Sequence, residues 1–204
     1  LNRATSRTQS ALLEAMEEGQ VTVDGVTHPV PQPFLVIATQ NPAGASGTQL
    51  LPDSQLDRFM VKLSLGYPSA ADETELLRRK QSGNPLSQVE RVATLEELEA
   101  MRTAVDRVYL SDAVCEYIVR LIGATREHPL IVQGASPRAT LAVAAMSRAA
   151  AFVRGRDYVT PNDVRLVFAD TISHRLLLSP RGESGEVGSP VEAILKGVQP
   201  PAIQ

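Results

Sequence analysis

Cysteine is nearly absent from this sequence, since Cys115 is the single one among 204 residues. A lone thiol excludes an internal disulfide and a zinc site built on cysteines. The histidines, His28, His128 and His174, are also few and lack the spacing typical of metal ligands. We therefore expect no metal site among these residues and a surface or packing role for each histidine.

Clustered positive charge and aromatic side chains are scarce as well. Aromatic residues make up 4% of the sequence, and the net charge is −3 with a pI of about 5.7. Phosphate backbones attract clustered Lys and Arg, and single-stranded nucleic acids stack on aromatic rings. The composition therefore argues against nucleic acid as the main partner.

Long apolar runs and several catalytic signatures are missing too. A membrane span needs ~18 apolar residues, and the best stretch, Leu141 to Val153, is interrupted by Ser147 and Arg148. The sequence contains no Gly-x-x-x-x-Gly-Lys-Ser/Thr phosphate loop, no Gly-x-Ser-x-Gly and no His-Glu-x-x-His. We therefore expect no membrane span, and no complete phosphate cradle within this sequence.

Apolar residues, at 43%, are frequent enough to predict a packed core in one large domain or two small ones. Near the amino terminus, Ser6-x-x-Gln9 reads as a capping box that opens a helix ending at Gly19. Asp24-Gly25 between alternating valines then predicts a β-hairpin over residues 21–28, because both turn residues favour a positive φ.

Two apolar runs, Phe34 to Ala38 and Met60 to Leu65, predict strands, the first buried on both faces as in a parallel sheet. Gly66-Tyr67-Pro68 marks a domain boundary, and residues 67–178 have a helical pattern. Polar residues that cap helices precede four of the segments, namely Thr94, Ser111, Ser136 and Thr160. Residues 179–189 have the composition of a linker, and a short helix is expected from Pro190.

Two polar residues stand at the ends of the predicted elements of the first part. Asn41 comes just after the first apolar run, and ligands of open α/β sheets bind at the carboxyl ends of strands. Asn41-Pro42 is equally typical of a simple turn. Arg58 precedes the second run, and its guanidinium suits a phosphate, although a salt bridge with Asp57 or another acid would explain it as well.

Arg138 is the most informative residue on physical grounds. It falls in the first turn of the helix opened by Ser136-Pro137. A cation there faces the positive end of the helix dipole, which costs roughly 0.3–1 kcal/mol. A nearby anion would reverse that sign, and a side chain that bends into solvent would avoid the cost.

Taken together, these segments resemble the MoxR family of AAA+ ATPases. The resemblance rests on an ordered set of motifs: Asn2-Arg3-Ala4, Thr8 to Met16, Gly19 to Thr22, Ala38 to Pro42, Leu56 to Phe59, Gly66-Tyr67-Pro68 and Gly134 to Arg138. The resemblance implies an α/β fold of the P-loop NTPase type. Its parts would be a partial AAA+ core with parallel strands and a hairpin insert (1–66), an all-α lid (67–178), and a linker with a short terminal helix (179–204).

The resemblance also implies roles for single residues. Asn41 matches the sensor-1 asparagine, which positions the attacking water. Arg58 matches the arginine finger, offered to the nucleotide of a neighbouring subunit, and Arg138 matches the sensor-2 arginine at the start of a lid helix. In the family, Asn-Arg-Ala follows the Walker B acids, so this sequence is expected to start just after them and to lack the phosphate loop and the catalytic acids.

The function implied is that of a cytoplasmic ATPase that forms a ring, expected to be a hexamer, and remodels client proteins, including von Willebrand factor A-type partners. ATP and Mg²⁺ would be bound by the intact parent, whereas this stretch alone is expected to hold neither tightly and to be inactive. Two alternatives stay open: a magnesium-chelatase-like AAA+ motor subunit, and a non-catalytic helical interaction module.

Overall fold

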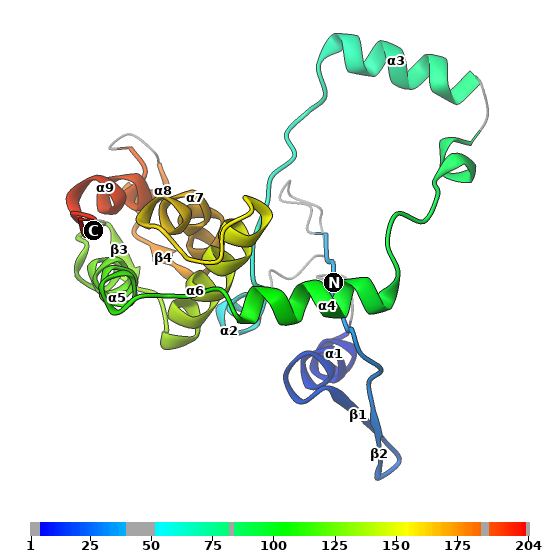
Figure 1. Cartoon of the computed structure of the whole chain (residues 1–204), viewed down its shortest axis with the longest axis horizontal. Helices are drawn as coiled ribbons and strands as arrows, with labels where there is room; N and C mark the ends of the chain where they lie inside the picture. Colours follow the sequence, from blue (N-terminus) through cyan, green and yellow to red (C-terminus); the bar gives the residue numbers. More distant parts are fainter. Residues whose placement is uncertain (1–4, 40–51, 82–83, 185–187, 203–204) are drawn as a thin grey trace.

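The computed structural model describes residues 5–39, 52–81, 84–184 and 188–202. Most of its helices gather in the carboxy-terminal half (Figure 1). The helices there are α4 (Leu95–Asp106), α5 (Asp112–Glu127), α6 (Pro137–Val153), α7 (Pro161–Ile172), α8 (Pro180–Glu183) and α9 (Pro190–Gly197). A short 3₁₀ turn, η2 (Ser173–Arg175), follows α7. Strands β3 (Ile131–Gln133) and β4 (Leu177–Leu178) pair antiparallel beside them.

The hydrophobic core lies among α5, α6, α7 and α9. Tyr117, Leu121 and Phe168 are fully buried there, and α6 packs along α7. Val191 and Ile194 of α9 belong to the same core, so it continues beyond residue 178. Residues 108–184 and 188–198 therefore form one packed, mainly helical unit, and from here on the name lid refers to this unit and not to the predicted range 67–178.

Local signals set the ends of these helices. Thr94 and Glu97 form a capping box at α4, Ser111 caps α5, and Thr160 with Asp163 caps α7, as the sequence predicts. Ser136 differs, because its hydroxyl makes no cap hydrogen bond and donates instead to Asp57 Oδ2 at 2.9 Å. That cap residue is therefore used for a contact between distant segments.

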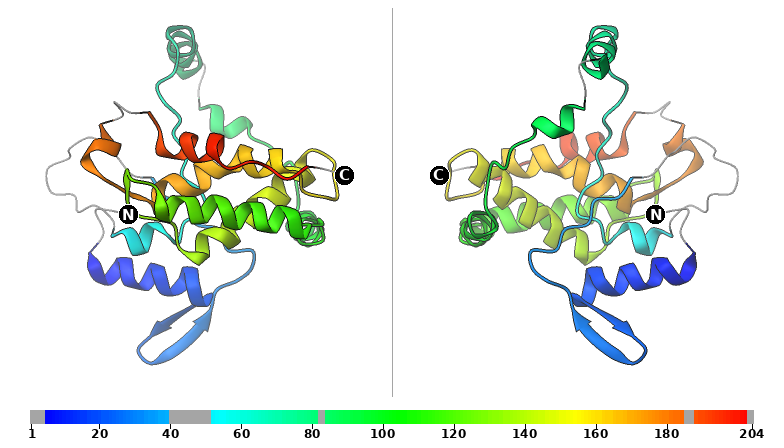
Figure 2. Two further views of the ribbon diagram at one scale, coloured as in Figure 1. Left: turned by 90° about the vertical axis from the view of Figure 1, so that its left-hand side faces the viewer. Right: turned by 90° about the vertical axis from the view of Figure 1, so that its right-hand side faces the viewer.

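The amino-terminal part consists of α1 (Ser6–Glu18) and a hairpin of β1 (Gln20–Val23) and β2 (Val26–Pro29). The cap of α1 is Thr5, one residue before the predicted Ser6. Gly19 ends the helix at φ 63°, and the hairpin turns at Asp24 and Gly25 with φ of 51° and 77°, as predicted. Figure 2 shows the hairpin projecting beyond the lid.

The two predicted core strands differ from expectation. Within the described ranges, both sheets are two-stranded and antiparallel, and neither includes residues 34–38 or 60–65. Ile37 is 84% exposed and Leu65 98%. The prediction that both runs form strands, with the first buried on both faces, is therefore wrong for this chain by itself, because no described strand pairs with them.

Before it reaches α4, the chain runs through α2 (Asp53–Leu56), α3 (Ala70–Gln81) and η1 (Pro85–Gln88). It lies near the lid at α2, leaves it towards α3 and returns to it along α4 (Figure 1). The start of this path is held on the lid: the carbonyl of Asp57 accepts from Arg175, and the N–H of Lys62 donates to the carbonyl of Asp170.

Candidate functional site

Arg58 and Arg138 meet at one carboxylate. Glu17, in the last turn of α1, forms ion pairs with the guanidiniums of both residues. Arg138 Nη2 donates to Glu17 Oε1 at 2.7 Å across 121 positions of sequence. In Figures 1 and 2, α2 lies between α1 and the lid. Three separate segments thus build this group, which we call the Glu17 cluster.

The Glu17 cluster carries more positive than negative charge. Two guanidiniums share one carboxylate, and burial, followed by the positive charge of Arg138, lowers the pKa of Arg58. The Nε of Arg58 is buried and has no hydrogen-bond acceptor among the described residues. A site with surplus positive charge and an unused donor suits an added oxyanion.

Arg138 behaves as its helix position suggests. It is the second residue of α6, where a cation opposes the helix dipole. Its side chain is 50% exposed and turns to Glu17. The sequence leaves open a nearby anion or a side chain that bends into solvent. In the structure a carboxylate of the same chain pairs with Arg138, while half of the side chain is still accessible to another ligand.

The residues beside Arg58 are fixed by the lid. The buried Arg175 of η2 donates through Nη1 to the carbonyl and carboxylate oxygens of Asp57, each at 2.8 Å, and through Nη2 to the carbonyl of Phe59 at 2.7 Å. Ser136 adds its bond to Asp57. Asp57 therefore pairs with Arg175, and the acid next to Arg58 in sequence is not its ion-pair partner.

Sequence reasoning missed Glu17, Asp57 and Arg175 as parts of this site. The sequence indicates Asp57 only as a candidate partner of Arg58, and Arg175 follows His174, for which a surface or packing role is expected. The third predicted residue, Asn41, lies outside the described residues, so its place relative to Arg58 stays a prediction. Among the described residues, no group of three His, Cys, Asp or Glu side chains is arranged to hold a metal ion.

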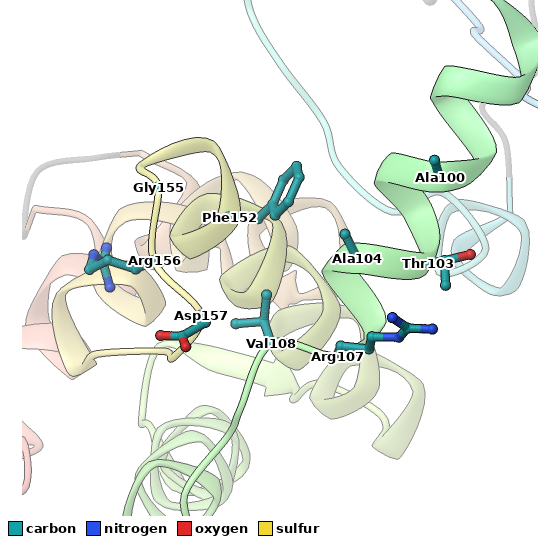
Figure 3. A pocket seen from close by; sticks show the side chains of 9 residues that line it. All are labelled: Ala100, Thr103, Ala104, Arg107, Val108, Phe152, Gly155, Arg156 and Asp157. Atoms are coloured by element: carbon teal, nitrogen blue, oxygen red, sulfur yellow. The ribbon is translucent and has the colours of Figure 1, made fainter.

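A separate hollow of about 900 Å³ lies between α4 and the lid. Figure 3 shows Ala100, Thr103 and Ala104 of α4 on one side, facing Phe152 and the turn after α6. The remaining lining residues are Arg107, Val108, Gly155, Arg156 and Asp157. None of them belongs to the Glu17 cluster, so this hollow is not part of the site around Arg58.

A membrane-spanning helix is absent from the described residues, because none of their helices combines the length and the apolar character that a span requires.

Two family profiles match this chain. Residues 1–61 match the ATPase family associated with various cellular activities (AAA). Residues 123–194 match the AAA lid domain. The first match covers Glu17 and Arg58, and the second covers Arg138 and Arg175, so the contacts described above join the two matched regions.

Similar curated proteins extend over most of the chain. The protein YeaC of Bacillus subtilis, which has no assigned function, is 42% identical over 97% of this chain and 61% of its own length. Chaperone MoxR1 of Mycobacterium tuberculosis is 40% identical over 88% of this chain and 49% of its own. Protein MoxR of Methylorubrum extorquens is 26% identical. The chain thus spans about half to three fifths of the length of these relatives.

Solved structures point to the same fold. A protein of Cytophaga hutchinsonii, provisionally described as an ATPase, superposes with a TM-score of 0.90 at 37% identity, covering 98% of this chain and 64% of that protein. A full-length MCM homologue of Methanopyrus kandleri superposes with a TM-score of 0.54 at 23% identity, which concerns the fold alone.

Proposed function

Because the chain belongs to the MoxR-type AAA+ ATPases, we propose that the full-length protein couples ATP binding and hydrolysis to remodelling or maturation of partner protein complexes. The name of the mycobacterial relative, a chaperone, supports this coupling. The activity is proposed for a protein of the relatives' length. Phosphoryl transfer needs a phosphate cradle, and this sequence contains no phosphate loop. The stretch alone should therefore be inactive.

The observation that carries the proposal is the convergence of Arg58 and Arg138 on Glu17. An arginine pair that shares one carboxylate and keeps a buried donor free can donate hydrogen bonds to a phosphate oxygen in addition to that carboxylate or in its place. We assign Arg58 the role of arginine finger and Arg138 that of sensor-2 arginine, both directed at the triphosphate. Bound ATP supplies the phosphoryl group, and these arginines bind and orient its oxygens.

Asn41 completes the proposed set as sensor 1, holding the attacking water. The described residues include no group suited to Mg²⁺, so we assign its coordination to none of them. The ring, expected to be a hexamer in the cytoplasm, would place Arg58 against the nucleotide of a neighbouring subunit. Client proteins, including von Willebrand factor A-type partners, would be the proteins acted upon.

The test substitutes each arginine in the full-length protein. Arg58→Ala should leave ATP binding nearly intact and lower turnover by roughly 10³-fold or more, because an arginine finger stabilises charge in the transition state. Arg138→Ala should also lower turnover. Arg102→Ala is the matched control, because Arg102 pairs with Glu99 on the exposed surface of α4. Wild-type turnover of Arg58→Ala would refute the assignment.

A mixing experiment tests the role across subunits. Arg58→Ala subunits mixed with subunits carrying a phosphate-loop substitution should recover part of the activity, since each supplies what the other lacks. If mixed rings form and no activity returns, Arg58 acts within its own subunit.

Glu17→Gln removes the carboxylate charge that competes with phosphate for Arg58 and Arg138, so this variant should bind ATP more tightly.

A further inference from the structure

The guanidinium of Arg175 donates hydrogen bonds to the backbone on both sides of Arg58. Its Nη1 binds the carbonyl of Asp57, and its Nη2 binds the carbonyl of Phe59, at 2.8 and 2.7 Å. These are the two residues flanking Arg58. A planar fork that holds both neighbours restricts the peptide from which the Arg58 side chain departs.

The carboxylate of Asp57 links the same backbone segment to the start of α6, the helix that carries Arg138. Its Oδ1 accepts from Arg175 at 2.8 Å, and its Oδ2 accepts from the hydroxyl of Ser136 at 2.9 Å. Ser136 directly precedes α6, two positions before Arg138. Asp57 therefore ties the backbone of Arg58 both to η2 and to the start of α6.

Two more hydrogen bonds hold the same stretch, residues 57–62, which we call the finger segment. The ring Nε2 of His174 lies 2.8 Å from the carbonyl of Phe59, and the backbone N–H of Lys62 donates to the carbonyl of Asp170 at 2.9 Å. All these partners belong to the lid. The residues that follow the finger segment, 63–68, are exposed.

Because the side chain of Arg175 is buried, the loss of these hydrogen bonds would be costly. The side chain of Arg175 is 2% exposed, and its Nε is also used, donating to the carbonyl of Thr171 at 2.9 Å. A buried guanidinium that loses its acceptors leaves an uncompensated charge, which is strongly destabilising. Arg175 therefore holds the finger segment tightly whenever the lid is folded.

We propose that Arg175, acting through Asp57, is a positioning residue that makes the finger segment part of the lid. Arg58 then moves with the lid and keeps a fixed relation to Arg138. Any rotation of the lid would carry both arginines towards or away from a phosphate together. This inference rests on the proposed function in one respect, namely that Arg58 acts on the nucleotide.

The experiment uses the full-length protein with Arg175→Lys, Asp57→Asn and the milder Ser136→Ala. Lysine keeps the charge but cannot bind both carbonyls as a fork. We expect kcat to fall about 10²-fold for Arg175→Lys, because a small misplacement of a catalytic group has that effect, while KM for ATP stays unchanged. Arg156→Lys is the control, since Arg156 pairs with Asp163 elsewhere on the lid.

A double substitution separates positioning from general damage. If Arg175 acts through Arg58, the double variant Arg58→Ala with Arg175→Lys should be no slower than Arg58→Ala alone. Hydrogen exchange provides a readout without nucleotide: the amide of Lys62 should lose protection in Arg175→Lys but not in Arg156→Lys. Ser136→Ala, which removes one hydrogen bond only, should show smaller changes of the same kind if the stronger variants fail to fold.

The outcomes distinguish the two proposals. Loss of turnover in Arg58→Ala with normal kcat in Arg175→Lys, Asp57→Asn and Ser136→Ala would overturn the positioning role and leave the proposed function standing. Normal turnover in Arg58→Ala would refute the proposed role of Arg58, whatever the exchange data show. Additive losses in the double variant would show that Arg175 does not act through Arg58.

Discussion

His174 is a single residue whose protonation should affect the stability of the lid. Its Nε2 lies against the carbonyl of Phe59 and its Nδ1 is buried without a partner among the described residues. Burial lowers the pKa of His174 from its ordinary value of 6.5, assisted by the charges of Arg175 and Lys62 and opposed by Phe59 and Asp57. The folded state therefore favours the neutral ring.

The first prediction concerns pH. Because the folded pKa lies below the unfolded value, the unfolded state binds more protons as pH falls below about 6.5. The free energy of unfolding should fall there, with a slope of at most about 1.4 kcal/mol per pH unit from this one group. Urea titrations between pH 5 and 8, as approximate limits, would measure it. His174→Gln should flatten the slope, and the exposed His28→Gln should not.

Single residues also show what local sequence can reveal. The motifs around Arg58 and Arg138 identify them as phosphate-binding candidates, because their residue types and helix positions are local properties. Their shared partner Glu17 lies 121 positions from Arg138 and carries no distinguishing pattern. Arg175 is equally unmarked, since its importance comes from three acceptors that only the folded chain brings together.

At the scale of elements, the predicted hairpin and helix caps depend on neighbouring residues and were therefore accessible from sequence. Asp24-Gly25 and the Thr94–Glu97 box are examples. The apolar runs at 34–38 and 60–65 depend on partner strands, which the described residues do not provide. Periodicity predicts that a segment can form a strand, but pairing decides whether it does.

The second prediction concerns the start of α7. Asp163 is fully buried, binds Arg154 at 3.1 Å and Arg156 at 2.5 Å, and closes the cap with Thr160. Although burial alone would raise it, hydrogen bonds from Arg156 and Thr160 hold the pKa of Asp163 well below its usual 3.8. Asp163→Asn should lower the free energy of unfolding by about 1.5–3 kcal/mol, because the neutral amide loses the charge-assisted hydrogen bonds from two partly exposed guanidiniums.

Chemical denaturation at neutral pH would measure that loss, with Asp106→Asn at the exposed end of α4 as the control. The stabilisation by Asp163 is complete above the ordinary pKa and is lost as pH falls towards the lowered folded value. The wild-type chain should therefore approach the variant in stability under strong acid. Equal stability of both at neutral pH would contradict the prediction.

At the scale of the whole molecule, the lid should fold without the amino-terminal part. Its core extends from Val108 to Ile194 and takes nothing buried from α4. Residues 107–202, expressed alone, lack the acceptors of Arg175 on Asp57 and Phe59, but loss of that segment also exposes the guanidinium to water. We therefore expect this fragment to melt cooperatively with helical circular dichroism. Residues 67–178, the extent predicted from sequence, lack α9 and should be less stable by about 3 kcal/mol or more, since Val191 and Ile194 are lost. A non-cooperative melt of 107–202 would contradict this.

The bond between Arg175 and Asp57 has a consequence for biosynthesis. Its two ends are 118 positions apart, so a ribosome makes Arg58 long before it makes the residue that positions it. Domains fold largely in the order of their synthesis, and the lid is completed last in this chain. Arg58 is therefore held in place only after α7 and η2 have emerged and packed. In a nascent chain arrested before Arg175, Arg58 would not be held in place. The site around Arg58 can therefore become functional only once the lid is complete.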